Sequence, residues 1–117
     1  METSTVSEMQ GTNLRFFMQA NARHKGKPLY EWLLEIARKE KLAGGSAFRA
    51  IAGFGRHGVL HEEAFFELAG DLPVRVEFVL RDEEAERLLD IVRAADVALV
   101  YMHSPVTIGV LGDHNMT

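Results

Sequence analysis

From Val74 to Leu80, apolar side chains alternate with others, and an amphipathic helical pattern follows directly. The apolar side chains at every second position are those of Val74, Val76, Phe78 and Leu80. This alternation is typical of a strand with one buried face. Asp82 is a plausible N-cap, and the helical pattern continues to about residue 95. A strand followed at once by a helix indicates a crossover connection to another strand.

The first half of the chain predicts a similar unit. A strand over 14–19 has Leu14, Phe16 and Met18 on one face. An amphipathic helix is expected over 28–42, with Pro28 in its first turn. Further strands are predicted over 46–53, which we expect to be mostly buried, and over 97–103, where Pro105 ends the strand or marks a sheet edge. The order βαββαβ predicts a ferredoxin-like α+β sandwich, a four-stranded antiparallel sheet with two helices on one face.

The second face of the predicted sheet mixes aromatic and charged side chains. Arg15, Phe17 and Gln19 lie on this face of the first strand, and Arg75, Glu77 and Val79 lie on it in the third. The strand over 46–53 adds Arg49 with Ile51, or Phe48 with Ala50, depending on its register. We interpret this face as a subunit interface in which charges pair across strands, and the alternative is an ordinary solvent-exposed surface.

The composition limits the possible classes of function. A length of 117 residues indicates one domain, expected over 12–106, between a disordered tail over 1–11 and a C-terminal tail over 107–117. There is no cysteine, which excludes disulfides and thiol chemistry. The net charge of −4 argues against nucleic acid as a partner. No apolar run is long enough to span a membrane, and no secretory signal is visible, so we expect a cytoplasmic protein.

A long connection over about 54–71 joins the second and third predicted strands. Its start, from Gly53 to Gly58, matches the pattern GxGxxG, but the chain is too short for the full dinucleotide-binding fold. Backbone N–H groups at these glycines, together with Arg56, could instead hold an anion such as a phosphate. The alternative is that the glycines only permit tight turns at the base of the loop.

Four further side chains are candidates for binding. Arg49 is expected to form a salt bridge with Glu77 or a neighbouring subunit, or to contact an anion. His57 and His61 are four residues apart and could bind a metal together with Glu62, although Gly58 weakens any helix between them. No arrangement of serine, histidine and acid indicates catalysis, so we predict that the chain is not an enzyme.

The chain resembles the uncharacterised PII-like family, the domain of unknown function 190. The resemblance covers roughly residues 13–104 and rests on the segments GKPLYE from Gly26, LAGGSAFR from Leu42, IAGFG from Ile51, then His61, and DLPV from Asp71. It implies a ferredoxin-like fold and a homotrimer, similar to PII signalling proteins and to copper-tolerance trimers. In PII proteins, the loop between strands two and three contacts the partner protein, and its base lines an intersubunit cleft for adenine nucleotides.

The resemblance and the residues together predict a trimeric regulatory protein without catalytic residues. We expect a small anionic effector, such as an adenine nucleotide, at the loop base, and a protein partner on the loop itself. The expected ligand-binding residues are Arg49, Gly53, Phe54, Gly55, Arg56 and His61. The junction from Arg93 to Val97 lacks the glycines of the second PII phosphate loop. The alternatives are a metal-binding trimer that uses His57, His61 and Glu62, and an interaction module without an effector.

Overall fold

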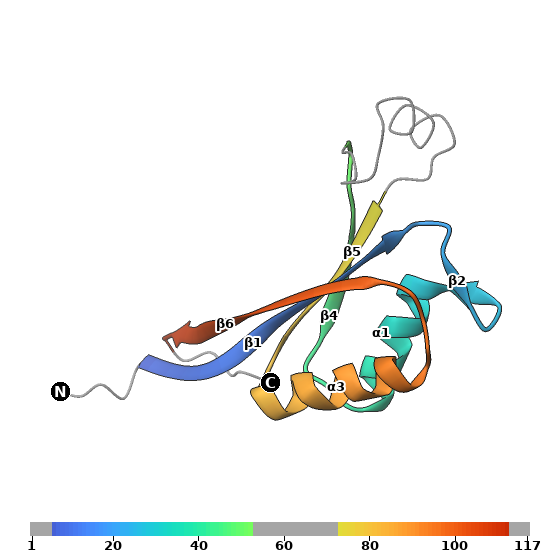
Figure 1. Cartoon of the computed structure of the whole chain (residues 1–117). Helices are drawn as coiled ribbons and strands as arrows, with labels where there is room; N and C mark the ends of the chain where they lie inside the picture. Colours follow the sequence, from blue (N-terminus) through green and yellow to red (C-terminus); the bar gives the residue numbers. More distant parts are fainter. Residues whose placement is uncertain (1–5, 53–72, 113–117) are drawn as a thin grey trace.

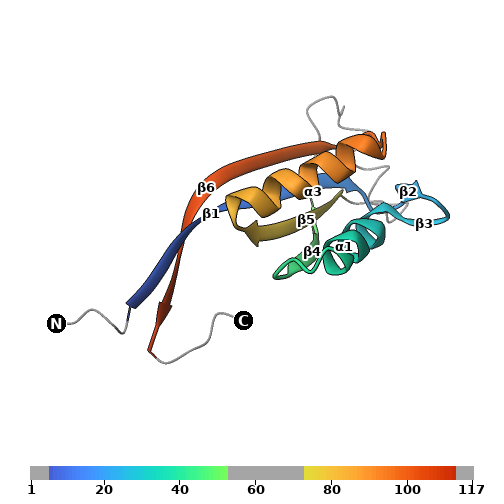
Figure 2. The ribbon, with the colours of Figure 1, turned by 90° about the horizontal axis from the view of Figure 1, so that it is seen from below.

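The computed structural model describes residues 6–52 and 73–112. Four strands form one antiparallel sheet in the order β4-β5-β1-β6 (Figure 1). The strands are β1 (Val6–Gln19), β4 (Gly45–Arg49), β5 (Pro73–Leu80) and β6 (Val100–Leu111). The helices α1 (Leu29–Lys39) and α3 (Asp82–Ala94) lie together on one face of the sheet, as Figure 2 shows from below. The ferredoxin-like α+β fold predicted from the sequence is confirmed.

The core lies between this sheet face and the two helices. Its largest fully buried side chains alternate along β1 and β5, and each helix adds one: Phe16, Phe78, Leu14, Leu33, Leu80, Leu88 and Val76. The rings of Phe16 and Phe78 meet edge to face at a centroid distance of 6.2 Å. The strand alternation read from the sequence therefore identifies the buried face correctly.

A small hairpin precedes α1 where the sequence predicted only a polar turn. It consists of β2 (Arg23–His24) and β3 (Lys27–Pro28), and its turn places Lys25 and Gly26 at positive φ. The imidazole of His24 meets the Trp32 ring of α1 at a centroid distance of 4.4 Å. This contact fixes the hairpin against the start of the helix.

The strands β1 and β6 differ from the expected boundaries. β1 begins at Val6, so residues 6–11, expected in a tail, form strand that pairs with β6. β6 begins at Val100 and not at residue 97, because Asp96 has a φ of 58° and residues 97–99 lead the chain back from α3 to the sheet. It continues through Pro105 to Leu111, beyond the predicted end at residue 103. As β6 is an edge strand, Pro105 costs only one possible hydrogen bond there.

β4 is shorter and more exposed than predicted. It ends at Arg49, and all five of its residues are exposed, because it is the other edge of the sheet and its first residues are small. Ladder pairing places Phe48 opposite Arg75 and Ser46 opposite Glu77. Of the two registers left open by the sequence, the structure has the one that puts Phe48 on the second face of the sheet.

The second face has no helix of the described residues over it, and we call it the free sheet face. It comprises Asn13, Arg15, Phe17, Gln19, Ser46, Phe48, Arg75, Glu77, Val79, Val100 and Met102. Four of its apolar side chains are at least 41% exposed: Phe48, Val79, Val100 and Met102. An exposed apolar patch of this kind, interrupted by paired charges, is typical of a contact surface.

Candidate functional site

The site lies where β4 ends and β5 begins, at the two ends of the connection between them. The last ladder pair is Arg49 opposite Val74, and the N–H of Ala50 donates a hydrogen bond of 2.9 Å to the carbonyl of Pro73. These bonds hold the two ends of the connection side by side. The base of the connection is therefore anchored to the sheet.

Pockets for small ligands have volumes of about 300–1,000 Å³, and the base of this connection has a pocket of 410 Å³. We call it the loop-base pocket. Its lining residues are Phe17, Phe48, Arg49, Ala50, Pro73, Val74 and Arg75. Among the described residues, the lining includes two arginines, Arg49 and Arg75, and no acidic residue, in a chain whose net charge is −4. Such a site attracts an anion.

Arg75 is held in place by two neighbours on the free sheet face. Its Cζ lies 4.6 Å from the centroid of the Phe48 ring, a cation–π contact. Its Nε is 3.2 Å from Oε1 of Glu77, within ion-pair distance but without the geometry of a hydrogen bond. Glu77 also accepts a hydrogen bond of 2.8 Å from Asn13 Nδ2. Since 42% of the Arg75 side chain remains exposed, its outer nitrogens are accessible to a ligand.

Arg49 differs from Arg75 in its surroundings. It is exposed, and it lies on the sheet face opposite to Glu77, so the predicted salt bridge between these two residues is wrong. The register explains this, because Arg49 is paired with Val74 whereas Glu77 is paired with Ser46. Arg49 forms no ion pair with any residue in 6–52 or 73–112. Its charge is thus not neutralised by a described residue, although its side chain and that of Arg75 lie on opposite faces of the sheet.

The remaining predicted ligands lie outside the described residues. These are Gly53, Phe54, Gly55, Arg56 and His61, together with the alternative metal ligands His57 and Glu62. Within the described ranges, no three histidine, aspartate or glutamate side chains come close enough together to hold a metal ion. The anion cradle and the histidine pair therefore stay predictions.

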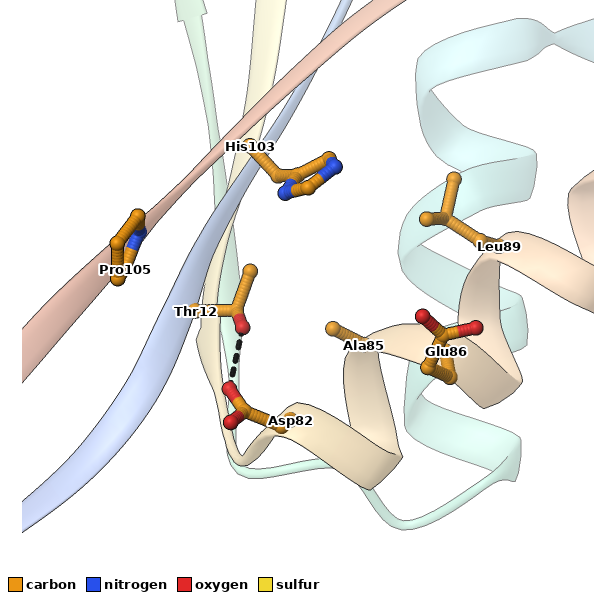
Figure 3. Close-up of a pocket in the computed structure, with 7 residues that line it drawn as sticks. All are labelled: Thr12, Asp82, Ala85, Glu86, Leu89, His103 and Pro105. Carbon is orange, nitrogen blue, oxygen red and sulfur yellow. Dashed lines mark hydrogen bonds between the residues drawn. The ribbon is translucent and has the colours of Figure 1, made fainter.

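A second pocket, of 350 Å³, has the opposite charge. It lies between α3 and β6, where Asp82 and Glu86 face Thr12, His103 and Pro105 (Figure 3). Oγ1 of Thr12 donates a hydrogen bond of 2.6 Å to Oδ1 of Asp82. Asp82 is the first residue of α3, and the N-cap is Arg81, whose N–H donates to Oε1 of Glu84. Two carboxylates make this pocket unsuitable for an anion, which leaves the loop-base pocket as the better candidate.

Sequence reasoning missed Phe17, Phe48 and Arg75 as members of the site. The signal was present in the alternation of β5, which puts Arg75 on the free sheet face. The missing information was the register of β4, since only the pairing of Phe48 with Arg75 brings the two side chains together.

Comparison with known proteins agrees with this architecture. A family model, DUF190, described as "Uncharacterized ACR", matches residues 11–108. The chain belongs to the DUF190 family. A UPF0166 protein of Aquifex aeolicus is 34% identical over 97 residues, which cover 76% of this chain and 92% of that protein.

Solved structures similar to this DUF190 chain are PII-like proteins. The apo form of CPII from Thiomonas intermedia K12, a nitrogen regulatory PII-like protein, has a TM-score of 0.60 at 12% identity, over 90% of this chain and 98% of that one. Another structure of CPII, bound to ADP, AMP and bicarbonate, has a TM-score of 0.58 at 14% identity, over 87% of this chain and 91% of that one. A putative PII-like signalling protein from Thermus thermophilus has a TM-score of 0.54 at 15% identity, over 89% and 92%. At these identities the similarity shows the fold.

No helix among the described residues is both long and apolar enough to cross a membrane.

Proposed function

We propose that this DUF190 protein is a PII-like regulatory protein that binds a small anionic effector in the loop-base pocket. An adenine nucleotide is the effector class we favour. The protein acts by binding and not by catalysis, and it works as a homotrimer in the cytoplasm. The connection between β4 and β5 contacts a protein partner, as the sequence predicts.

The observation that carries this proposal is the presence of two arginines, Arg49 and Arg75, among the residues that line the base of the connection. Arg49 has no ion-pair partner in the described residues, and Arg75 shares only one carboxylate, with its outer nitrogens accessible. Guanidinium groups bind phosphate oxygens in a bidentate manner, and these charge-assisted bonds are among the strongest hydrogen bonds in proteins.

The apolar part of the pocket supports a nucleotide over a simple inorganic anion. Phe17, Phe48 and Pro73 line it beside the two arginines. A nucleotide offers a planar base for the aromatic side chains and phosphates for the guanidinium groups. The binding of ADP and AMP by CPII, whose fold is similar, adds independent support for this effector class.

Self-association through the free sheet face follows from its composition. Arg15 and Arg75 lie beside Glu77 and among exposed apolar side chains, so one copy of the face offers both charges and an apolar surface to another. The resemblance to PII proteins favours three copies around one axis. In such an assembly, the base of the connection lies close to a neighbouring subunit, which can complete the pocket.

The experiment is a thermal-shift screen against nucleotides, cyclic nucleotides and simple anions, with the purified full chain. We expect at least one anionic ligand to raise the Tm of the wild type, and the rise to be reduced in Arg49→Gln. Lys39→Gln is the control, because it removes a cation from the last turn of α1, away from the pocket lining. An absence of any shift across the panel would contradict the proposal.

A further inference from the structure

β1 and β6 extend beyond the rest of the sheet. The pairing of β1 with β5 ends at Thr12 opposite Leu80, but its pairing with β6 continues to Val6 opposite Leu111. Residues 6–11 and 106–111 therefore form a two-stranded projection, which we call the terminal ribbon. Figure 2 shows it leaving the body of the molecule beyond both helices.

The two sides of the terminal ribbon differ in polarity. One side has the apolar side chains of Met9, Val106, Ile108 and Val110, all of them partly buried. The other side is exposed and has mainly polar or small residues: Glu8, Gln10, Thr107 and Gly109, with Leu111 at the end. Cδ1 of Ile108 would lie only 3.3 Å from a Cβ placed on Gly11, so this glycine lets Ile108 lie across β1. This pattern is typical of a strand pair with one buried side and one solvent-exposed side.

A two-stranded ribbon is marginally stable in water by itself. The radius of gyration of the chain is 17.0 Å, whereas a compact domain of this length has about 13 Å. The longest dimension is 59 Å against 28 and 20 Å for the other two. An extended apolar ribbon of this kind needs another surface to cover it.

The apolar side of the ribbon continues the free sheet face. On β6 the same side carries Val100, Met102, Val106, Ile108 and Val110, interrupted only by Ser104. The surface that covers the free sheet face can thus extend along the ribbon without a break. Six residues of strand span about 20 Å, which matches the shortest dimension of the molecule, 20 Å. The ribbon is therefore long enough to lie across a second copy in that direction.

Charge argues against a membrane as the covering surface. Residues 6–11 and 106–111 contain no lysine or arginine, the ribbon carries Glu8, and the chain as a whole has a net charge of −4. Acidic lipid surfaces attract basic segments and repel acidic ones. The free sheet face, in contrast, presents both charges, with Arg15 and Arg75 beside Glu77, and is therefore complementary to a copy of itself.

We propose that the apolar side of the terminal ribbon packs against a second copy of this chain. The ribbon extends the subunit contact beyond the free sheet face and fastens neighbouring subunits together. This inference depends on the self-association in the proposed function, but not on the binding of an anion.

The test compares two neighbouring residues on opposite sides of β6. Ile108→Asp puts a charge on the apolar side, and Thr107→Asp puts the same charge on the exposed side. Sedimentation velocity over a dilution series measures assembly of the full chain. We expect Thr107→Asp to assemble like the wild type and Ile108→Asp to raise the dissociation constant roughly tenfold or more. Val110→Asp, nearer the tip of the ribbon, should act like Ile108→Asp, while circular dichroism shows that each variant keeps its fold.

Amide hydrogen exchange supplies a second measurement at the ribbon itself. In the assembled wild type, we expect amides in 6–11 and 106–111 to be protected and to lose that protection in Ile108→Asp. If Ile108→Asp and Val110→Asp both assemble like the wild type, the inference is overturned. A wild-type protein that stays monomeric would also overturn the inference, and it would contradict the homotrimer in the proposed function. Titration of each variant with ADP reports separately on the loop-base pocket.

Discussion

The guanidinium carbon of Arg75 lies 4.6 Å from the centroid of the Phe48 ring, and the two residues are ladder partners on β5 and β4. This contact joins the edge strand to the sheet at the base of the connection. It also holds a cation beside an apolar surface in the loop-base pocket. The pocket therefore depends on a pairing of strands that are distant in the sequence.

The energy of this pair can be measured with a double-mutant cycle. Phe48→Leu removes the ring but keeps apolar bulk, and Arg75→Met removes the charge. We expect a coupling free energy of about 0.5–1 kcal/mol between them in urea denaturation at a fixed protein concentration. Additive effects of the two substitutions, within about 0.3 kcal/mol, would mean that the cation–π contact contributes nothing.

Gly45 fits β4 against the core. A Cβ at this position would lie 2.4 Å from Cε1 of Phe78, which is only 1% exposed and cannot move aside. We expect Gly45→Ala to lower the free energy of unfolding by about 1–3 kcal/mol. The matched control is Gly109→Ala in β6, where the nearest atom is Cγ of Glu8 at 3.6 Å. Equal stability of the two variants in chemical denaturation would contradict this packing.

The hydrogen bond from Thr12 to Asp82 joins β1 to the first turn of α3. We expect Thr12→Val to lower the free energy of unfolding by about 1 kcal/mol, because the carboxylate loses its donor. Thr107→Val is the comparison, since its hydroxyl donates a longer bond of 3.3 Å to Gln10 on the exposed side of the ribbon. The two denaturation midpoints should differ, and a Thr12→Val variant as stable as the wild type would refute the role of this bond.

The pKa of the Glu35 carboxyl is lower in the folded chain than its ordinary value. A hydrogen bond of 2.6 Å from Lys27 Nζ lowers the pKa of the Glu35 carboxyl, and Arg38 and Lys39 act in the same direction. Because the pKa of Glu35 is lowered in the folded chain, the interaction stabilises the fold at pH values above the pKa that Glu35 has in the unfolded chain. That stabilisation is lost as the pH falls through the folded pKa. Because the side chains are exposed, the effect on stability is small.

We expect Lys27→Met to return the pKa of Glu35 towards its ordinary value. An NMR titration of the Glu35 side chain measures this directly, and Arg23→Met, a substitution on the partner strand of the same hairpin, serves as the control. An unchanged pKa in Lys27→Met would show that the hydrogen bond is not the cause of the shift.

The core and the sheet topology could be predicted because local patterns determine them. The alternation of Leu14, Phe16 and Met18 and that of residues 74–80 are both confirmed. Along the chain, each of these two strands is followed by a helix whose apolar positions recur at helical spacing. These signals are contained within short segments, so they require no knowledge of which strands pair.

The terminal ribbon could not be predicted by the same means. Residues 6–11 and 107–111 contain polar residues and glycines, and each segment alone resembles a tail. They form strand because each supplies the hydrogen-bond partners of the other across about 100 residues of sequence. Such pairing depends on the whole fold and leaves only a weak local pattern.

Arg49 illustrates the same limit in the site. A sequence can identify an arginine at the end of a strand, but it cannot say on which face of the sheet the arginine side chain lies. The expected salt bridge with Glu77 required the other register of β4. The actual register puts Arg49 and Glu77 on opposite faces of the sheet and places Phe48 beside Arg75.

We propose that the base of the β4–β5 connection recognises a phosphate-bearing ligand through Arg49 and Arg75. Isothermal titration calorimetry with ADP and with adenosine, against the wild type, Arg49→Gln and Arg38→Gln, tests this proposal. We predict that ADP binds the wild type and Arg38→Gln alike, that adenosine binds far more weakly, and that Arg49→Gln weakens ADP binding roughly tenfold or more. ADP binding that is undetectable in the wild type, or equally strong in Arg49→Gln, would contradict the claim.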